Sequence, residues 1–537
     1  MKTSPLSRAM KTSPLSRALL VLAIASASTQ VNAQDSIVQD QSAEITFVNA
    51  PNMALNQQQL IQAIILRNGQ ALLSQTQQQV AAGNINRERS LLQPELFAEA
   101  RYTDTERQST TSDRLSNITS AFGTIDEQNT DVEAGVRVPV ATGAELVLSW
   151  SGNQREGNLV EAASNGDSNT EAVASLNVSI RQPLLQGIGN RIANARIKEA
   201  ELQHQRAEYD FHDQLLRVSS SALRAYWRMY LSSQFIEIQQ SALDNARNIM
   251  QETQNQVNAG RQPRTALLEA EARVIESRAA LYNEEQRWRD IQSELKTLLN
   301  LSHDAYAMLT FTPIDSPETT PYGASQNFDA YAEDVLSQWP GYHSALLARD
   351  IQRLQTNRAV EENRNQLDLV AGYRTSALET RIGDAVSESY ATTYPTWYVG
   401  VEFSMPLGAN LKRSGDIGSA EARQRQAEIE LRDIEVSVVN ELRTRLHQLE
   451  VAHNDLQLAA RNQQLYGELY AAERSNYTLG RGRLRDLYER EDDRIEAQQR
   501  HAESLALYQL ALVAIRLAEG SLFERYGVQI NKTLSQG

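Results

Sequence analysis

Apolar positions follow two different periods along the chain. Between Ile197 and Ala259 there is neither proline nor glycine, and apolar residues recur at alternating spacings of four and three. This spacing is typical of helices that wrap around one another. Elsewhere apolar and polar residues alternate one by one, as strands do, and each such run ends near a proline, Pro183 or Pro406. The pattern therefore predicts strands that lead into long helices. The predicted helical seam comprises Phe211, Leu215, Val218, Ala222, Ala225, Met229, Ala242, Ala246 and Ile249.

Short motifs recur at a constant shift of 220 residues, as from Gly260 to Gly480. Asn300 and Gly520 lie at the same shift, and both residue types suit the left-handed conformation that closes a helix. A constant length indicates two copies of one unit. Each copy is predicted as a helix, two strands and a long helical hairpin. The predicted bounds are residues 34–309 for repeat 1, 310–329 for a proline-containing linker, 330–537 for repeat 2 with its C-terminal tail, 60–90 and 330–366 for the early helices, 92–104 and 367–376 for the first strands, and 186–300 and 412–520 for the hairpins.

A polar insertion at about 106–171 separates the strands of the first repeat. Within it, residues 131–151 carry an extra hairpin pattern, with apolar residues at alternate positions on both sides of Thr142-Gly143. We favour an extracellular extension for this insertion. Additional strands of the same sheet are the alternative.

The N-terminus has the features of a signal peptide. Residues 1–9 are repeated as 10–18, and basic residues precede an apolar run that ends before Ala33, which predicts a signal peptide at 1–33. After Ala33 no run reaches the roughly 18 apolar residues of a membrane helix, so any membrane contact is expected from strands. Four strands leave open edges that lipid does not tolerate. If these strands are membrane strands, the chain must therefore assemble with copies of itself.

Composition excludes several functions. The net charge of −15 disfavours a nucleic-acid partner, and the lack of cysteine excludes both disulfides and a lipid on cysteine. The seven histidines show no zinc spacing, and no nucleophile elbow or phosphate loop occurs. An acidic run at 489–493 spreads around a helix, as a solvated face does. We therefore expect no catalytic residue, no cofactor and no metal site, and not an enzyme.

The junction and tip motifs together resemble the TolC-type outer membrane efflux proteins, also called outer membrane factors. The residues that carry the resemblance are Arg181-Gln-Pro-Leu-Leu-Gln-Gly187, Ser404-Met-Pro-Leu-Gly408, Gln256-Val-Asn-Ala-Gly260 and Tyr477-Thr-Leu-Gly480. The resemblance implies a mainly α-helical fold with membrane β-structure. It implies a homotrimer in which four strands per subunit close a 12-stranded β-barrel, continuous with a long α-helical periplasmic barrel.

The resemblance also implies a function. The chain is expected in the cell outer membrane, extending into the periplasm, as a passive export duct for small molecules or polypeptides. The expected partners are outer-membrane lipid, a periplasmic adaptor and an inner-membrane transporter of a tripartite efflux or type I secretion system.

The resemblance carries over to particular residues as well. It places a periplasmic constriction at Asp486 and Glu489, which share one helix face at a spacing of three. The alternative is that these acids only favour the helix N-terminus. At the position where the family has an acid that helps to hold the entrance closed, this chain has Ala266. The resemblance therefore does not extend to that residue. The expected adaptor-docking tips are Gly260, Arg261, Gly480, Arg481 and Arg483, although exposed arginines also serve solvation, and the strand-to-helix junctions are Pro183 and Pro406.

Two other functions predict different architectures. A periplasmic adaptor would have one helical hairpin inside a lipoyl-type β domain. A structural exported coiled-coil protein would have no reason for paired strands that end in proline.

Overall fold

The structure is a computed structural model that describes residues 52–110, 123–164, 167–302, 306–323, 327–390, 394–407 and 410–528. The predicted signal peptide, 1–33, lies outside the described residues. All described residues belong to one compact unit, Asn49–Gly537. Among the described helices, none is both long enough and apolar enough to cross a membrane.

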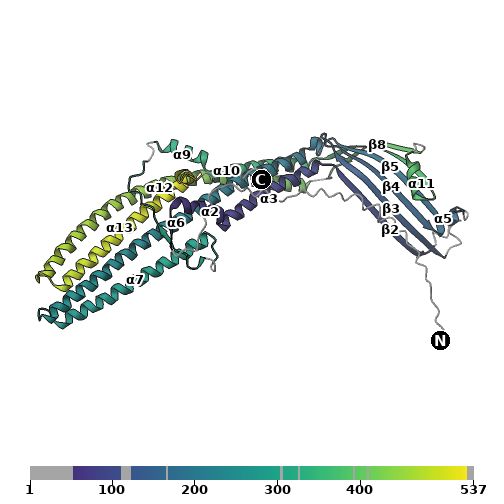
Figure 1. The fold of residues 1–537 in the computed structure, drawn as a ribbon. Coiled ribbons are helices and arrows are strands. Elements are labelled where there is room, and N and C mark those ends of the chain that lie inside the picture. Colours follow the sequence, from purple (N-terminus) through teal and green to yellow (C-terminus); the bar gives the residue numbers. More distant parts are fainter. Residues whose placement is uncertain are drawn as a thin grey trace, which may run out of the picture. The chain divides into compact units, whose positions relative to one another are not determined.

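Two long antiparallel helical hairpins form most of the helical structure (Figure 1). The first consists of α6 (Arg191–Asn258) and α7 (Arg264–Leu298), and the second of α12 (Leu411–Thr478) and α13 (Leu484–Glu519). Both α6 and α12 have 68 residues. Because α6 contacts both α7 and α13, and α13 contacts α12, the four helices lie in the order α7, α6, α13, α12.

Shorter helices pack against the long ones. Helices α2 (Gln57–Arg67), α3 (Gly69–Arg89) and α10 (Pro340–Glu362) contact α6, while α9 (Phe328–Gln338) contacts α12. The helix predicted at 60–90 is interrupted at Asn68, whose side chain caps α3 by accepting from the backbone N–H groups of Gln70 and Ala71. The helix predicted at 330–366 is interrupted before Pro340, which begins α10. The remaining short elements are η2 (Ser90–Leu92), η3 (Ile188–Asn190) and α14 (Leu522–Arg525).

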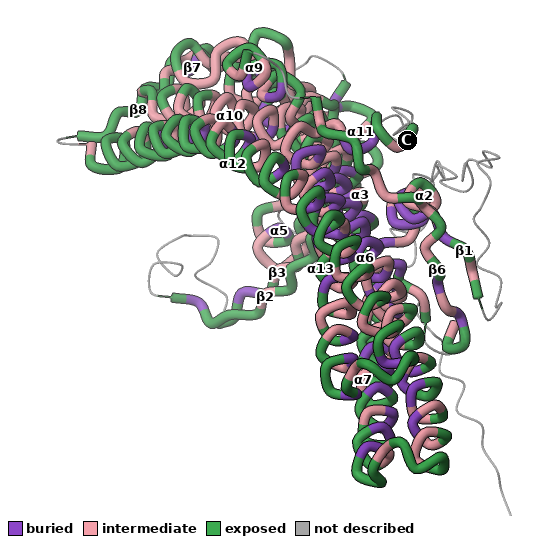
Figure 2. Tube along the Cα trace, turned by 90° about the vertical axis from the view of Figure 1, so that its left-hand side faces the viewer, coloured by how far each residue is buried: buried purple, intermediate pink, exposed green. Residues whose placement is uncertain are grey.

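The predicted seam of α6 is confirmed, because every one of its nine residues from Phe211 to Ile249 is buried. Figure 2 shows buried and exposed positions alternating along α6, α7 and α13. Amphipathic helices of this length are stabilised chiefly by burying such a stripe, rather than by helix propensity.

The two hairpin tips share one backbone motif. Gly260 and Gly480 adopt left-handed conformations, with φ of 72° and 74°. The N–H of Arg261 donates to the carbonyl of Gln256 at 2.8 Å, and the N–H of Arg481 donates to that of Asn476 at 2.8 Å. These are Schellman motifs, which require a residue that tolerates positive φ. Asn300 and Gly520 also have positive φ, as their shared spacing predicted.

Strands from before and after the first hairpin in the sequence form one six-stranded antiparallel sheet. Its order is β2-β3-β4-β5-β7-β8, with every neighbouring pair antiparallel. The strands are β2 (Glu95–Gln108), β3 (Thr124–Pro139), β4 (Glu145–Gly157), β5 (Thr170–Pro183), β7 (Gln366–Glu379) and β8 (Pro395–Ser404). Two short helices follow strands, α5 (Asn158–Ala163) after β4 and α11 (Ile382–Ser389) after β7.

The sheet therefore differs from the four strands that we expected. Strands β3 and β4 are the hairpin predicted at 131–151, and they lie inside the sheet between β2 and β5. The favoured interpretation of an extension apart from the sheet is wrong for this hairpin. The physical reason is that its alternating apolar residues continue the apolar face of the neighbouring strands, which pairing inside the sheet completes.

The segment predicted as a linker, 310–329, is tied to the helices. Strand β6 (Phe311–Pro313) pairs in parallel with β1 (Met53–Leu55). Glu318 forms ion pairs with Arg516 at 3.0 Å and Arg525 at 2.9 Å. Gln509 donates to the carbonyl of Glu318 at 2.6 Å. The chain between the hairpins is thus held against α13.

Candidate functional site: the faces, edges and tips

The sheet has one apolar face that crosses all six strands. Because directly paired residues share a face, the register defines rows across the sheet. One row contains Leu96, Val136, Leu148, Val178, Tyr373 and Trp397, one residue from each strand. Leu96 and Trp397, at the two ends of the row, are 73% and 72% exposed in the single chain. An apolar band with aromatic residues is what the lipid-facing side of a membrane barrel requires.

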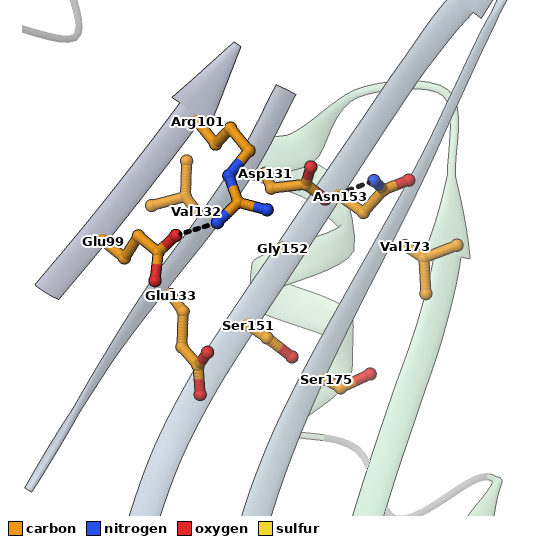
Figure 3. Close-up of a pocket in the computed structure, with 10 residues that line it drawn as sticks. All are labelled: Glu99, Arg101, Asp131, Val132, Glu133, Ser151, Gly152, Asn153, Val173 and Ser175. Atoms are coloured by element: carbon orange, nitrogen blue, oxygen red, sulfur yellow. Dashed lines mark hydrogen bonds and ion pairs between the residues drawn. The ribbon is translucent and has the colours of Figure 1, made fainter. Parts of the chain in front are cut away.

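The opposite face of the sheet is polar and internally bonded (Figure 3). The row that lies three residues further along β2 contains Glu99, Glu133, Ser151, Ser175 and Ser376. Beside it, the side-chain amide of Asn153 donates to Asp131 at 2.7 Å, and Arg101 pairs with Glu99 at 2.6 Å. Charges on this face suit contact with water rather than lipid.

The order of the strands leaves β2 and β8 at the two edges of the sheet. An unpaired edge presents backbone N–H and C=O groups, which lipid cannot satisfy. The strands alternate in direction and are even in number, so β8 of one copy and β2 of another can pair in the antiparallel sense.

The outer helices of the four-helix layer carry matching apolar stripes. On α7, Leu268, Ile275 and Tyr282 repeat every seven residues and are exposed. On α12, Val451, Leu458 and Leu465 repeat every seven residues and are exposed as well. Both stripes lie in the half of the helix next to its tip. A heptad stripe is a seam that packs against another helix, and neither stripe is covered within the chain.

Side chains predicted for the constriction and the tips are exposed. Asp486 lies in the first turn of α13, and Glu489 lies one turn further along and is 3.4 Å from Arg490. Leu484 and Leu487 of the same helix are buried, so the two acids lie on the outward face. The residues of the two tips, Gly260, Arg261, Gly480, Arg481 and Arg483, are all exposed.

The prolines at the junctions lie between strand and helix. Pro183 is the last residue of β5, and Pro406 follows β8 by two residues. Within the described residues no three acidic, histidine or cysteine side chains come together as candidate metal ligands.

The hairpins contact each other near the tips through pairs of residues that the sequence did not predict to meet. The hydroxyls of Thr253 and Tyr477 lie 2.9 Å apart, and Arg474 pairs with Glu252 at 2.6 Å. Thr253 follows Ile249 by four residues and continues the seam, so a polar residue at a seam position was the available signal. Ala266 lies in the apolar cluster with Tyr477, Ile249, Leu484 and Leu487. Where the family has an acid, this chain therefore has apolar packing.

A buried carboxyl group lies on α13, farther from the tips than this contact. Glu491 on α13 is 1% exposed, and neither of its carboxylate oxygens has a hydrogen-bond partner. Arg494 lies 3.7 Å away and covers the ring of Tyr470 at 4.6 Å. Burial raises the pKa of Glu491, and the nearby arginines Arg494, Arg273 and Arg474 oppose this shift.

Comparisons with known proteins agree with this geometry. Residues 140–301 match the family model described as "Outer membrane efflux protein". A comparison with curated protein sequences returns no match. Among solved structures, the Campylobacter jejuni CmeC outer membrane channel is similar at 15% identity with a TM-score of 0.66, covering 89% of this chain and 88% of that chain.

Two further solved structures share the fold. The outer membrane protein VceC of Vibrio cholerae is similar at 14% identity with a TM-score of 0.62, covering 86% of this chain and 96% of that chain. The MtrE outer membrane channel of Neisseria gonorrhoeae is similar at 15% identity with a TM-score of 0.59, covering 86% of this chain and 88% of that chain. The resemblance that the junction and tip motifs predicted is therefore confirmed: residues 140–301 match the outer membrane efflux protein family model, and the chain has the fold of solved outer membrane channels.

Proposed function

We propose that three copies of the chain form a passive outer-membrane duct. The duct serves a tripartite efflux or type I secretion system and exports small molecules or polypeptides. A periplasmic adaptor docks at the helical tips, and an inner-membrane transporter supplies the energy. No cofactor and no catalytic residue enters this function.

One observation carries the proposal: both the sheet and the helical layer end in edges that no described part of the chain covers. The sheet leaves β2 and β8 unpaired, and the helical layer leaves apolar stripes on α7 and α12. The two edges of each layer are different surfaces of one chain. Contacts of this head-to-tail kind generate a closed ring when the rotations from one copy to the next add up to a full turn. The number three comes from the resemblance to the family.

The alternative functions fit this architecture less well. An adaptor was expected to have one helical hairpin, whereas the chain has two. A purely structural coiled coil was expected to lack paired strands, whereas six strands form a continuous sheet.

Asp486 and Glu489 form the constriction in this proposal. Threefold symmetry turns two exposed carboxylates on one face of α13 into two stacked acidic rings. Such rings concentrate cations and select by charge.

The test is block of the reconstituted duct by a trivalent cation added from the periplasmic side. With Asp486→Asn and Glu489→Gln together, the blocking concentration should rise roughly thirtyfold, since the two lost rings together remove roughly 2 kcal/mol of attraction. The matched control is Glu496→Gln, an exposed acid further along α13. Unchanged block in the double variant would remove both residues from the constriction.

Docking at the tips is tested separately. Arg481→Glu with Arg483→Glu should reduce co-purification of the adaptor while leaving the trimer intact, because both side chains are exposed. Arg461→Glu, exposed on α12 away from the tip, is the control. Equal adaptor recovery in all three proteins would show that the adaptor binds elsewhere.

A further inference from the structure

Strands β3 and β4 are the part of the sheet that a four-stranded subunit does not contain. They are as long as their neighbours, with 16 and 13 residues. β3 pairs with β2 over the full length of β2, from Glu95 to Gln108, and β4 pairs with β5 from Glu145 to Glu156. β2 and β5 have no direct pairing in the described sheet, because this hairpin separates them.

The hairpin continues the apolar face without a break. Val136 on β3 and Leu148 on β4 lie in the row that begins at Leu96 and ends at Trp397. Leu148 is 47% exposed, comparable with the apolar residues of the four other strands. If the hairpin stood in water, polar residues would be expected at its positions in this row. Val136 and Leu148 are both apolar.

The hairpin also continues the polar face. Arg137 on β3 pairs with Glu95 on β2 at 2.7 Å, and Arg155 on β4 pairs with Glu127 on β3 at 2.7 Å. Figure 3 shows Glu99, Glu133, Ser151 and Ser175 following one another across four strands on this face. Both hairpin strands therefore have a water-facing and a lipid-facing side, like the strands around them.

We propose that all six strands form the barrel wall and that the trimer closes an eighteen-stranded barrel, with β2 of each copy pairing with β8 of the next. This inference rests on the proposed trimeric duct and changes its barrel from twelve strands to eighteen. Since barrel diameter grows roughly linearly with strand number, the opening at the outer membrane is about half as wide again. Barrels of 16 to 18 strands leave an aqueous channel.

Single cysteines test the position of the hairpin, because the natural chain has none. Leu148→Cys places a fluorescent label on the apolar face of the hairpin, Ser151→Cys on its polar face, and Val401→Cys on the apolar face of β8 as the control. The full-length trimer is reconstituted in vesicles whose lipids carry bromine on the acyl chains, which quench fluorescence on contact. We expect strong and similar quenching at Leu148→Cys and Val401→Cys, and little at Ser151→Cys.

Quenching at Val401→Cys without quenching at Leu148→Cys would overturn the eighteen-stranded barrel while leaving the duct in place. An absence of quenching at both positions would contradict the proposed membrane duct itself, and the barrel with it.

Paired cysteines give a second test within one chain. Ser151 and Ser175 are direct partners on β4 and β5, so Ser151→Cys with Ser175→Cys should form a disulfide in the membrane-embedded trimer. Glu99→Cys with Ser175→Cys should not, because two strands separate these positions. The reverse pattern would mean that β2 pairs with β5 and that the hairpin has left the wall.

Discussion

The two long helical hairpins bury the same seam. They differ on the second face of their first helix, the side of α6 or α12 that does not form the seam. Buried positions of α6 recur in α12 at the shift of 220: Ala200, Phe211, Val218, Ala222 and Met229 correspond to Ala420, Leu431, Val438, Leu442 and Leu449, and all ten are buried. The second face of α6 is buried as well, by α2, α3 and α10. On α12 the corresponding face stays open, with Val436 56% exposed.

One pair of positions shows the difference most clearly. Trp227 of α6 is fully packed, whereas His447, its counterpart at the shift of 220, lies at the surface. The seam thus determines the fold of each hairpin, and the second face determines what that hairpin contacts next. In the first hairpin the contact is within the chain. In the second, α9 and α10 contact α12, and positions such as Val436 and His447 stay open in the single chain.

The largest expected effect comes from charging the open stripe of α12. Leu458→Asp with Leu465→Asp places two carboxylates in a seam that the neighbouring copy's α7 would cover, where unpaired charge is costly. The trimer should be lost, as measured by light scattering in detergent. Gln464→Asp, exposed on a different side of α12, should leave the trimer intact. Trimers of normal stability in the double variant would contradict the assignment of this stripe.

The next effect compares the second faces directly. Trp227→Ala removes a buried aromatic side chain and should destabilise the protein by roughly 3–5 kcal/mol. His447→Ala, at the corresponding surface position, should change stability by about 0.5 kcal/mol or less. Thermal unfolding in detergent reports both. Similar losses in the two variants would mean that the second faces are equally covered in the assembly.

These differences also show how far sequence alone carries. The four-three spacing of the seam and the shift of 220 predicted both hairpins, their tips at Gly260 and Gly480, and the left-handed residues Asn300 and Gly520, because each depends on local geometry. The place of β3 and β4 was missed, since alternation from Val132 to Trp150 predicts strands but not their neighbours. The contact between Thr253 and Tyr477 was missed for a similar reason, because it joins residues that are far apart in sequence.

A smaller effect sharpens the contact between the hairpins. Tyr477→Phe removes the hydroxyl that lies 2.9 Å from Thr253 and should cost about 1 kcal/mol, with raised conductance if this contact holds the tips together. Tyr488→Phe is the matched control, because its buried hydroxyl has no hydrogen-bond partner and its removal should be neutral or stabilising. If the two variants behave alike, the hydrogen bond does not join the hairpins.

The smallest expected effect is a pH dependence at Glu491. Burial raises its pKa in the folded chain, so its contribution to stability is full below the unfolded pKa and is lost as the pH rises through the folded pKa. The side chain in Glu491→Gln stays uncharged at every pH. The unfolding midpoint of this variant should therefore rise relative to that of the natural protein as the pH rises from acidic to neutral. The exposed control Glu496→Gln should show a smaller trend. If the difference in midpoint between Glu491→Gln and the natural protein instead shrank as the pH rises, burial would not raise the pKa of Glu491.

The central claim is that this chain cannot complete its own sheet or its own helical layer. The mass of the purified mature protein, measured by light scattering with and without detergent, tests this claim most directly. The account predicts a particle of three chains that requires detergent to stay in solution. A monomer that stays soluble without detergent would contradict it.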